Sequence, residues 1–230
     1  LLPDYPVHLQ HFTCSTAKKG YSGVAILIRK GGIADIGAKV TAGYDTSDEI
    51  VQTEGRLLTF KAPGLPTVIA TYVPNSGQKL DRLRYRCETW DRNLSNYVKA
   101  QGSSTIVIGD MNCCHLPEDI HNMYVRPNFD DMRRGNVDIV KQYKGLSGPA
   151  KQAGLTVEER QSFSKLLNDA NLVDTFRHKH PEAVGIFSYY SQRVVANRSM
   201  NRGLRLDYVL ASPSLHLAGA FLLSMDEIWP

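Results

Sequence analysis

Short apolar runs bounded by turn residues constrain the fold of this chain most strongly. Each has the length of a strand and is rich in β-branched or large apolar side chains, which strands favour. The clearest runs are GVAILIRK (23–30), RLLTFKA (56–62), TVIATYV (67–73), TIVIGD (105–110) and LRLDYVLA (204–211). They come in groups that are adjacent in sequence, so we expect one sheet or a pair of sheets built from these segments.

Two helices are expected between the strands. One has apolar residues spaced three and four apart, which predicts a helix of about six turns with one buried stripe. Its stripe consists of Leu80, Leu83, Cys87, Trp90, Leu94, Tyr97 and Val98. The other begins with Thr156 and Glu159, a capping-box pair that satisfies free amide groups at a helix start. Phe163, Leu166 and Leu167 then supply its buried face. Strands broken by helices predict a mixed α/β fold.

The composition fits one globular domain with a sizeable core. Of the 230 residues, 42% are hydrophobic and 22% are charged, and the net charge is +4. This charge is compatible with a polyanionic partner but does not require one. No apolar run approaches the length of about 20 residues that a membrane span needs, and the start of the chain lacks a signal-peptide layout. We therefore expect no membrane association.

The four cysteines have no spacing typical of a disulfide framework. They are Cys14, Cys87, Cys113 and Cys114. This pattern favours a reducing, intracellular location.

A long polar stretch runs from residue 113 to residue 154. It contains the cations Arg134, Lys141, Lys144 and Lys151 among several glycines. Loops of this length in compact domains are usually functional or disordered. A basic loop with glycines could offer amide and ammonium groups to phosphates, and a solvated insertion is an equally good interpretation.

The run TIVIGD ends in a Gly-Asp-x-Asn pattern. In an extended strand, Asp110 and Asn112 point to the same side. The carboxylate could accept a proton or hold a hard cation, and the amide could donate to a phosphate oxygen. Taken alone, such a pattern is more often a turn than an active site.

The cluster Cys113, Cys114 and His115 suggests zinc, with His121 as a distant further ligand. Adjacent cysteines lack the spacing of ordinary zinc sites, and the chain has no second pair. Thiols without a role are the better interpretation.

Two further residues are candidates for chemistry. Tyr72 lies at the end of a predicted strand in TYVPNSG, where a phenol that caps the core is the simplest interpretation. Asp207 lies within the predicted strand 204–211, and a carboxylate there needs a partner because an unpaired buried charge is costly. A structural ion pair and an acid that orients a catalytic histidine both remain open.

Taken in order, nine segments resemble the exonuclease III family of AP endonucleases, and the match covers nearly the whole chain. They are KGYSGVAIL (19–27), EGR (54–56), TYVPNSG (71–77), RCETWD (86–91), VIGDMN (107–112), GLTVEERQSF (154–163), LVDTFRHKHP (172–181), FSYYSQR (187–193) and NRGLRLDYVLAS (201–212).

The resemblance implies a fold and an activity. The fold is a four-layered α/β sandwich, in which two mostly antiparallel or mixed sheets are flanked by helices. The activity is Mg²⁺-dependent hydrolysis, with Mn²⁺ as an alternative, of the phosphodiester 5′ to an abasic site in double-stranded DNA. It belongs to base-excision repair, leaves a 3′-hydroxyl and often includes 3′–5′ exonuclease action. A monomer inside the cell is implied, in the nucleus of a eukaryote or in an organelle.

The resemblance also implies roles for particular residues. Asp110 matches the residue that orients or deprotonates the attacking water, and Asn112 matches the amide that positions the scissile phosphate. The same pair, Asp110 and Asn112, is implied as metal ligands. Tyr72 matches a phenol that contacts the phosphate, and Asp207 matches an acid that orients a catalytic histidine. A wall of the pocket for the base-free sugar is implied by Tyr189, Leu204 and Leu206.

A free aspartate has a pKa near 3.9, so Asp110 is a weak base unless desolvation raises its pKa. Otherwise it would act mainly by positioning water.

The chain also departs from the family pattern. An upstream strand with a metal-binding glutamate and a downstream Ser-Asp-His motif are absent from the 230 residues. We therefore expect residues 1–230 to be a single domain that lacks its first strand or strands and its last strand, with little activity as an isolated chain. The competing hypotheses are a non-catalytic DNA-binding relative and a phosphodiesterase for another substrate.

Overall fold

The structure is a computed structural model that describes residues 7–121 and 152–222. Its centre is a six-stranded sheet with the strand order β3-β4-β5-β6-β8-β7, and a two-stranded sheet joins β1 to β2. The strands are β1 (Val7–Cys14), β2 (Gly23–Arg29), β3 (Lys39–Ala42), β4 (Leu57–Lys61), β5 (Thr67–Tyr72), β6 (Thr105–Asp110), β7 (Val173–Asp174) and β8 (Asp207–Ala211). The expected mixed α/β fold with two sheets and helices is confirmed.

Most helices are short. The helical segments are η1 (Ile33–Asp35), α1 (Glu49–Thr53), α2 (Leu83–Tyr85), the π-helical turn η2 (Arg86–Trp90), α3 (Asp91–Ala100), η3 (Pro117–Asp119), α6 (Val157–Asp169), α7 (Thr175–Lys179) and η5 (Val195–Asn197). Among residues 7–121 and 152–222, none is long and apolar enough to cross a membrane.

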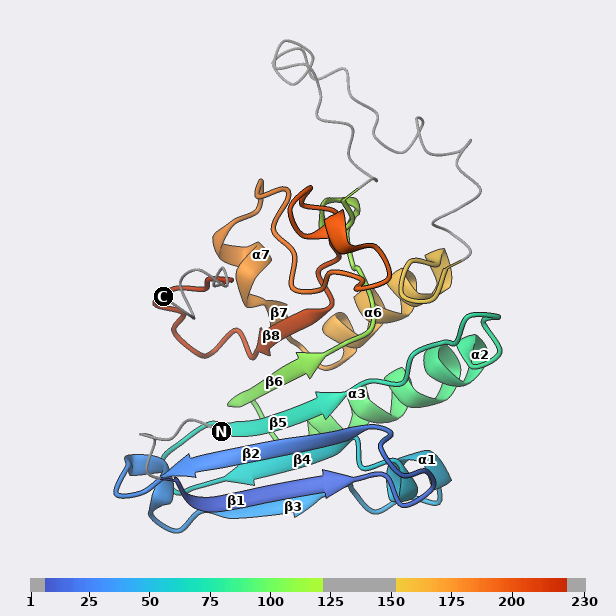
Figure 1. Cartoon of the computed structure of the whole chain (residues 1–230). Helices are drawn as coiled ribbons and strands as arrows, with labels where there is room; N and C mark the ends of the chain where they lie inside the picture. Colours follow the sequence, from blue (N-terminus) through green and yellow to red (C-terminus); the bar gives the residue numbers. More distant parts are fainter. Residues whose placement is uncertain (1–6, 122–151, 223–230) are drawn as a thin grey trace.

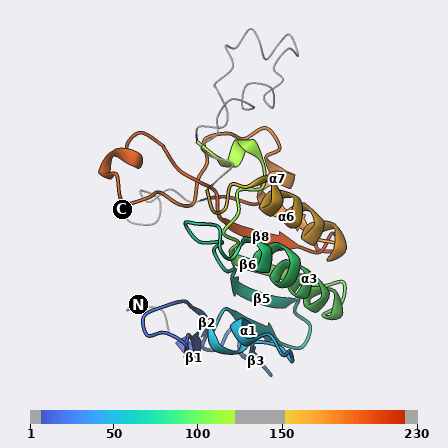
Figure 2. The same cartoon turned by 90° about the vertical axis from the view of Figure 1, so that its right-hand side faces the viewer.

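The helices α3 and α6 lie side by side along one face of the six-stranded sheet, and the sheet β1–β2 lies against the other face at β4 (Figure 1, Figure 2). The core lies under the helices, where Ile69, Val107 and Leu210 of three neighbouring strands pack in one cluster with Trp90 and Phe163. All five side chains are almost fully buried. Each Å² of apolar surface that is buried contributes about 25 cal/mol, so this layer stabilises the packing of the helices on the sheet.

The order of the strands places the site. Strands β5 and β6 are parallel, with α3 in the connection between them, so both strands end at the same edge of the sheet. Strand β8 pairs antiparallel with β6, so it begins at that edge. Strand ends that carry polar residues therefore meet at one edge.

Two of the predicted elements begin three residues later than expected. The helix expected from residue 80 begins at Leu83, because Leu80 has a left-handed φ of 59° and closes a turn onto Gly77. The helix is also interrupted by the π-helical turn η2 before α3 begins. The strand expected from residue 204 begins at Asp207, because Leu204 forms only isolated bridges with Ile120 and Tyr189.

The capping box at α6 is confirmed. The Thr156 hydroxyl accepts a hydrogen bond from the Glu159 amide at 3.1 Å, and a Glu159 carboxylate oxygen accepts one from the Thr156 amide at 3.1 Å. Of the basic stretch 113–154, residues 122–151 lie outside the described residues, so the four cations Arg134, Lys141, Lys144 and Lys151 do as well.

Candidate active site

Three of the predicted residues meet in one row across neighbouring strands. Tyr72 is aligned with Asp110 in the parallel pair of β5 and β6, and Asp110 is aligned with Asp207 in the antiparallel pair of β6 and β8. Aligned residues of adjacent strands point to the same face of a sheet. Val107 of β6 packs under α3 and α6, whereas the next residue, Ile108, points to the opposite face and is 41% exposed. Asp110 lies two residues after Ile108, so it also points to the face opposite the helices. Tyr72, Asp110 and Asp207 thus lie side by side.

Asp110 is held at the end of β6 by its neighbour. One of its carboxylate oxygens, Oδ1, accepts a hydrogen bond from the backbone amide of Asn112 at 2.7 Å. Burial raises the pKa of Asp110 to about 6, the bond from Asn112 opposes this rise, and the charge of Asp207 adds to it. A carboxylate whose pKa lies near neutrality can accept a proton in water activation, which an ordinary aspartate does poorly. The sequence alone could not show whether Asp110 is desolvated, and the structure shows that it is.

Asn112 lies in a left-handed turn with a φ of 47° and is only 6% exposed. Its side-chain nitrogen donates to the Val73 carbonyl at 2.8 Å, and its side-chain oxygen accepts from the Asn75 nitrogen at 3.0 Å. Asn75 in turn accepts from the Gly77 amide at 2.9 Å. The loop after β5 therefore fixes the side-chain amide of Asn112. Among the described residues the second N–H of this amide has no acceptor, so it can donate to a ligand.

Two supporting residues were missed by the sequence reasoning. Asn75 lies within the quoted segment TYVPNSG but was given no role in the site. Arg56 was quoted within EGR without a role, but its guanidinium carbon lies 4.8 Å from the centre of the Tyr72 ring. Neither contact is a local pattern, because 37 positions separate Asn75 from Asn112 and 16 separate Arg56 from Tyr72.

The start of β8 is fixed by Ser188. Its hydroxyl oxygen accepts hydrogen bonds from the amides of both Leu206 and Asp207, each at 3.0 Å. The neighbouring residue Tyr189 forms a β-bridge with Leu204, so two of the three expected sugar-pocket residues come together. The third, Leu206, is buried in a small core cluster with Cys114, Ile120 and Leu155, and Leu204 packs against this cluster. Asp207 itself is exposed.

A buried ion network supports the segment before Asp207. Arg205 is 1% exposed and donates to Asp119 at 2.8 Å and to Asp174 at 2.6 Å. Arg177 also donates to Asp119 at 2.8 Å. These bonds join η3, the start of α7 and the start of β8. Asp174 also caps α7, because its side chain accepts a hydrogen bond from the backbone amide of Arg177.

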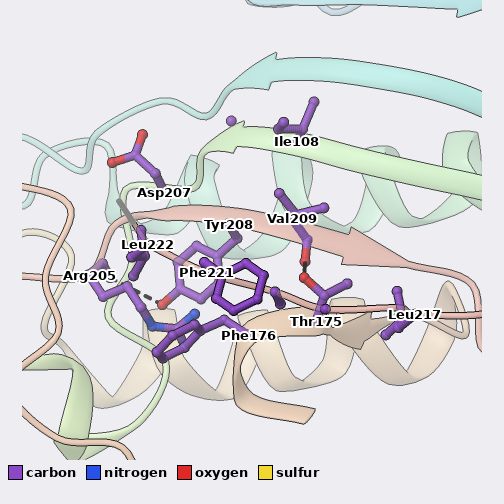
Figure 3. A pocket seen from close by; sticks show the side chains of 13 residues that line it. Ile108, Thr175, Phe176, Arg205, Asp207, Tyr208, Val209, Leu217, Phe221 and Leu222 are labelled. Atoms are coloured by element: carbon purple, nitrogen blue, oxygen red, sulfur yellow. Dashed lines mark hydrogen bonds between the residues drawn. The ribbon is translucent and has the colours of Figure 1, made fainter. Parts of the chain in front are cut away.

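A cavity of about 370 Å³ opens beside Asp207 on the exposed face of the sheet. Figure 3 shows Asp207 at one end of it, with Ile108 and Val209 of neighbouring strands along its length and Phe176 and Phe221 nearby. The lining is mainly apolar. Such a surface can accept an apolar group but has few donors for phosphate.

The zinc interpretation of Cys113, Cys114 and His115 finds no support. Both cysteines are fully buried, and burial raises the pKa of each thiol, which disfavours the thiolate that zinc requires. The His115 ring instead hydrogen bonds to Ser164 at 2.8 Å. Within residues 7–121 and 152–222, no group of three or more His, Cys, Asp or Glu side chains could hold a metal ion.

The oxygen atoms at the strand ends match the preferences of a hard cation. Mg²⁺ binds mainly carboxylates, with water completing its coordination. Asp110 keeps one carboxylate oxygen without a bond to Asn112, Asp207 lies opposite it, and the Asn112 side-chain oxygen can accept a further contact. These groups fit part of a magnesium shell.

Comparison with known proteins identifies the family. Residues 1–225 match the Endonuclease/Exonuclease/phosphatase family. The chain is 30% identical over 214 residues to an exodeoxyribonuclease of Bacillus subtilis (strain 168), covering 92% of this chain and 70% of that protein. It is 32% identical over 216 residues to the DNA repair nuclease APEX1 of Danio rerio, covering 93% of this chain and 58% of that protein.

The fold is also shared with solved structures. The AP endonuclease LMAP of Leishmania major superposes with a TM-score of 0.66 at 29% identity, covering 89% of this chain and 62% of that one. An AP endonuclease of Archaeoglobus fulgidus gives a TM-score of 0.64 at 26% identity, covering 90% and 67%. The chain thus spans between 58% and 70% of the length of these four proteins. The sequence match and the shared fold agree, and the chain belongs to the Endonuclease/Exonuclease/phosphatase family.

Proposed function

We propose that this chain is part of an AP endonuclease of DNA base-excision repair. The reaction is hydrolysis of the phosphodiester 5′ to an abasic site in double-stranded DNA, with 3′–5′ exonuclease action as an accompanying activity. The observation that carries the proposal is the row of Tyr72, Asp110 and Asp207 across three adjacent strands, with Asn112 at its edge. Relatives named as an exodeoxyribonuclease and a DNA repair nuclease support the choice of substrate.

Each residue has a role that its surroundings favour. Asp110, with a pKa near 6, holds the attacking water and accepts its proton. Asn112 donates its second side-chain N–H to a phosphate oxygen. The hydrogen bonds with Val73 and Asn75 keep this donor in place as negative charge develops on the phosphate. The Tyr72 hydroxyl donates to another oxygen of the same phosphate.

Asp207 is exposed beside Asp110 and is proposed to orient a histidine. The wall of the sugar pocket is proposed to consist of Tyr189, Leu204 and Leu206. The Leu206 side chain is buried, so it would support this wall from the protein interior.

Asp110 and Asn112 are the proposed ligands of a Mg²⁺ or Mn²⁺ ion. When bound, the cation would neutralise phosphate charge and the charge of the leaving oxygen. The monomeric state, the nuclear or organellar location and the single-domain organisation of residues 1–230 stay predictions.

The test is incision of two labelled duplexes that differ only in one tetrahydrofuran abasic analogue. The full reading frame that contains these residues is assayed with Mg²⁺ and with a chelator. We expect Mg²⁺-dependent cleavage 5′ to the analogue. Cleavage of the intact duplex should be slower by about 100-fold or more, because general-base catalysis requires a phosphate that is held in the correct position.

Equal rates on the two duplexes would argue against specificity for abasic sites and for another phosphodiester substrate. Binding of duplex DNA that weakens steeply with salt, without any hydrolysis, would identify a non-catalytic DNA-binding relative.

A further inference from the structure

The row at the strand ends has a fourth member. Arg56 immediately precedes β4 and lies opposite Tyr72, because its carbonyl oxygen accepts a hydrogen bond from the Tyr72 amide at 2.9 Å. The same carbonyl accepts from the Thr71 hydroxyl at 3.1 Å. Although arginine usually lies at the surface, Arg56 is only 2% exposed. Its side chain is therefore enclosed beside the phenol.

The Arg56 guanidinium lies between two tyrosine rings. Its central carbon is 4.8 Å from the centre of the Tyr72 ring and 5.3 Å from the centre of the Tyr21 ring. One of its terminal nitrogens, Nη1, donates to the Tyr72 carbonyl at 3.0 Å, and the other, Nη2, donates to the Tyr21 hydroxyl at 2.9 Å. A cation held against an aromatic face is attracted by the negative charge density of the ring. Arg56 thus contacts both the backbone and the ring of Tyr72.

Glu54 and Arg82 fix the remaining side of this guanidinium. The Arg56 Nε donates to a Glu54 carboxylate oxygen at 2.6 Å. Arg82 donates to the same carboxylate at 3.2 Å and to the Tyr21 hydroxyl at 2.8 Å. The Tyr21 hydroxyl therefore accepts two hydrogen bonds, which uses both of its acceptor positions. The guanidinium plane has one orientation that satisfies every partner.

Stability alone does not account for this arrangement. A buried ion pair often contributes no more than well-packed apolar residues would, because both charges lose their hydration. A planar cation with fixed donors does define the orientation of a neighbouring ring. We propose that Arg56 is a positioning residue for Tyr72 and keeps the phenol hydroxyl directed toward the phosphate beside Asp110. The proposal rests on the proposed function only for the identity of that phosphate.

The first test measures the Tyr72 ring without any reaction. The protein is labelled with 3-fluorotyrosine, and the Tyr72 fluorine resonance is identified as the signal lost in Tyr72→Phe. Arg56→Lys keeps the charge but loses the planar fork and its stacking. We expect a shifted or broadened Tyr72 resonance while the protein remains folded.

Two variants make this test decisive. Glu54→Gln removes the charge that holds Nε and is expected to move the same resonance by a smaller amount, which covers the case in which Arg56→Lys fails to fold. Arg84→Lys is the control, since Arg84 is 87% exposed and forms a surface ion pair with Glu88. An unchanged Tyr72 resonance in folded Arg56→Lys and Glu54→Gln would overturn the proposal.

The second test is kinetic and uses the full reading frame on the tetrahydrofuran duplex. A small displacement of a reacting group can cost up to about 100-fold in rate, so we expect Arg56→Lys to lower kcat by about 10-fold to 100-fold with little change in KM. In the Tyr72→Phe background, where the hydroxyl is already absent, the same change should cost less than about 3-fold.

Losses that multiply fully in the double variant would overturn the proposal, because Arg56 would then act without Tyr72. A protein that cleaves no DNA but shows the shifted Tyr72 resonance would refute the proposed function and leave the positioning by Arg56 in place.

Discussion

Asp110 and Asp207 lie directly opposite each other, as aligned residues of the antiparallel strands β6 and β8. Directly opposed side chains of like charge on one face of a sheet repel each other, and the repulsion is relieved when one of them binds a proton or a cation. Burial is the main cause that raises the pKa of Asp110 to about 6, and the charge of Asp207 adds to this rise.

The first prediction concerns the charge of Asp207. Because burial is the main cause of the raised pKa of Asp110 and the charge of Asp207 adds to it, Asp207→Asn should lower that pKa from about 6 without restoring its ordinary value. The measurement is a carboxyl-carbon NMR titration of Asp110 without divalent cations. Glu88→Gln, which removes an exposed charge on another surface, serves as the control and should leave the titration unchanged.

The second prediction concerns stability and pH. The folded state binds a proton at Asp110 more tightly than the unfolded state does, since its pKa is raised to about 6 from 3.8. The corresponding stability is therefore fully present below pH 4 and is lost as the pH rises through about 6.

Asp110→Asn lacks this loss, so its free energy of unfolding relative to wild type should rise by on the order of 2 kcal/mol between pH 4 and pH 7.5. Urea unfolding at both pH values measures the difference. A difference that stays constant with pH would show that Asp110 has an ordinary pKa.

The third prediction concerns the residue before Asp110. Gly109 has a φ of 141°, and a Cβ atom there would lie 1.9 Å from the Thr71 carbonyl oxygen of β5. Gly109→Ala must therefore push β6 away from β5, and we expect it to lower the free energy of unfolding by about 3 kcal/mol or more.

Gly64→Ala is the matched control, because Gly64 also has a positive φ of 74°, but an added Cβ atom there would meet no described residue within 4 Å apart from its two chain neighbours. It should cost only the conformational penalty of about 1 to 2 kcal/mol. Equal costs for the two variants would mean that strand contact at Gly109 is unimportant.

The sequence predicts the strands of the site well and the contacts between them poorly. The run TIVIGD forms β6 with the predicted bounds, because a β-branched run that ends in Gly-Asp is a local signal. Thr156 and Glu159 likewise encode the start of α6 within four residues. Strand β1 was missed, since VHLQHFTC alternates weakly, and within the described part of the chain it pairs with β2 alone.

The arrangement of the site depends on pairing that no single segment encodes. The sequence LRLDYVLA does not indicate that β8 pairs with β6. This pairing is what places Asp207 beside Asp110. The raised pKa of Asp110 and the enclosure of Arg56 follow from the same packing. The sequence patterns indicated the candidate site residues one by one, and only the resemblance to a family indicated that they belong to one site.

The fourth prediction concerns the buried ion network. Asp119 is fully buried and accepts hydrogen bonds from both Arg205 and Arg177. Asp119→Ala removes one of the two carboxylates that pair with the buried Arg205 and also an acceptor of Arg177, while the bond from Arg205 to Asp174 remains. We therefore expect the free energy of unfolding to fall by about 3 kcal/mol.

The exposed pair of Arg84 and Glu88 provides the comparison, since Glu88→Ala should change stability by less than about 0.5 kcal/mol. Both are measured by chemical denaturation. A loss below about 1 kcal/mol for Asp119→Ala would mean that the network does not hold the start of β8.

The central claim is that Asp110 activates water for phosphodiester hydrolysis at an abasic site. The most direct measurement is the single-turnover rate of Mg²⁺-dependent incision at one tetrahydrofuran site, for the full reading frame and its Asp110→Asn variant. Asparagine keeps the size of the side chain and its bond from the Asn112 amide but cannot accept the proton. We expect the rate to fall by about 100-fold or more while duplex binding is retained. A rate within about 3-fold of wild type would contradict it.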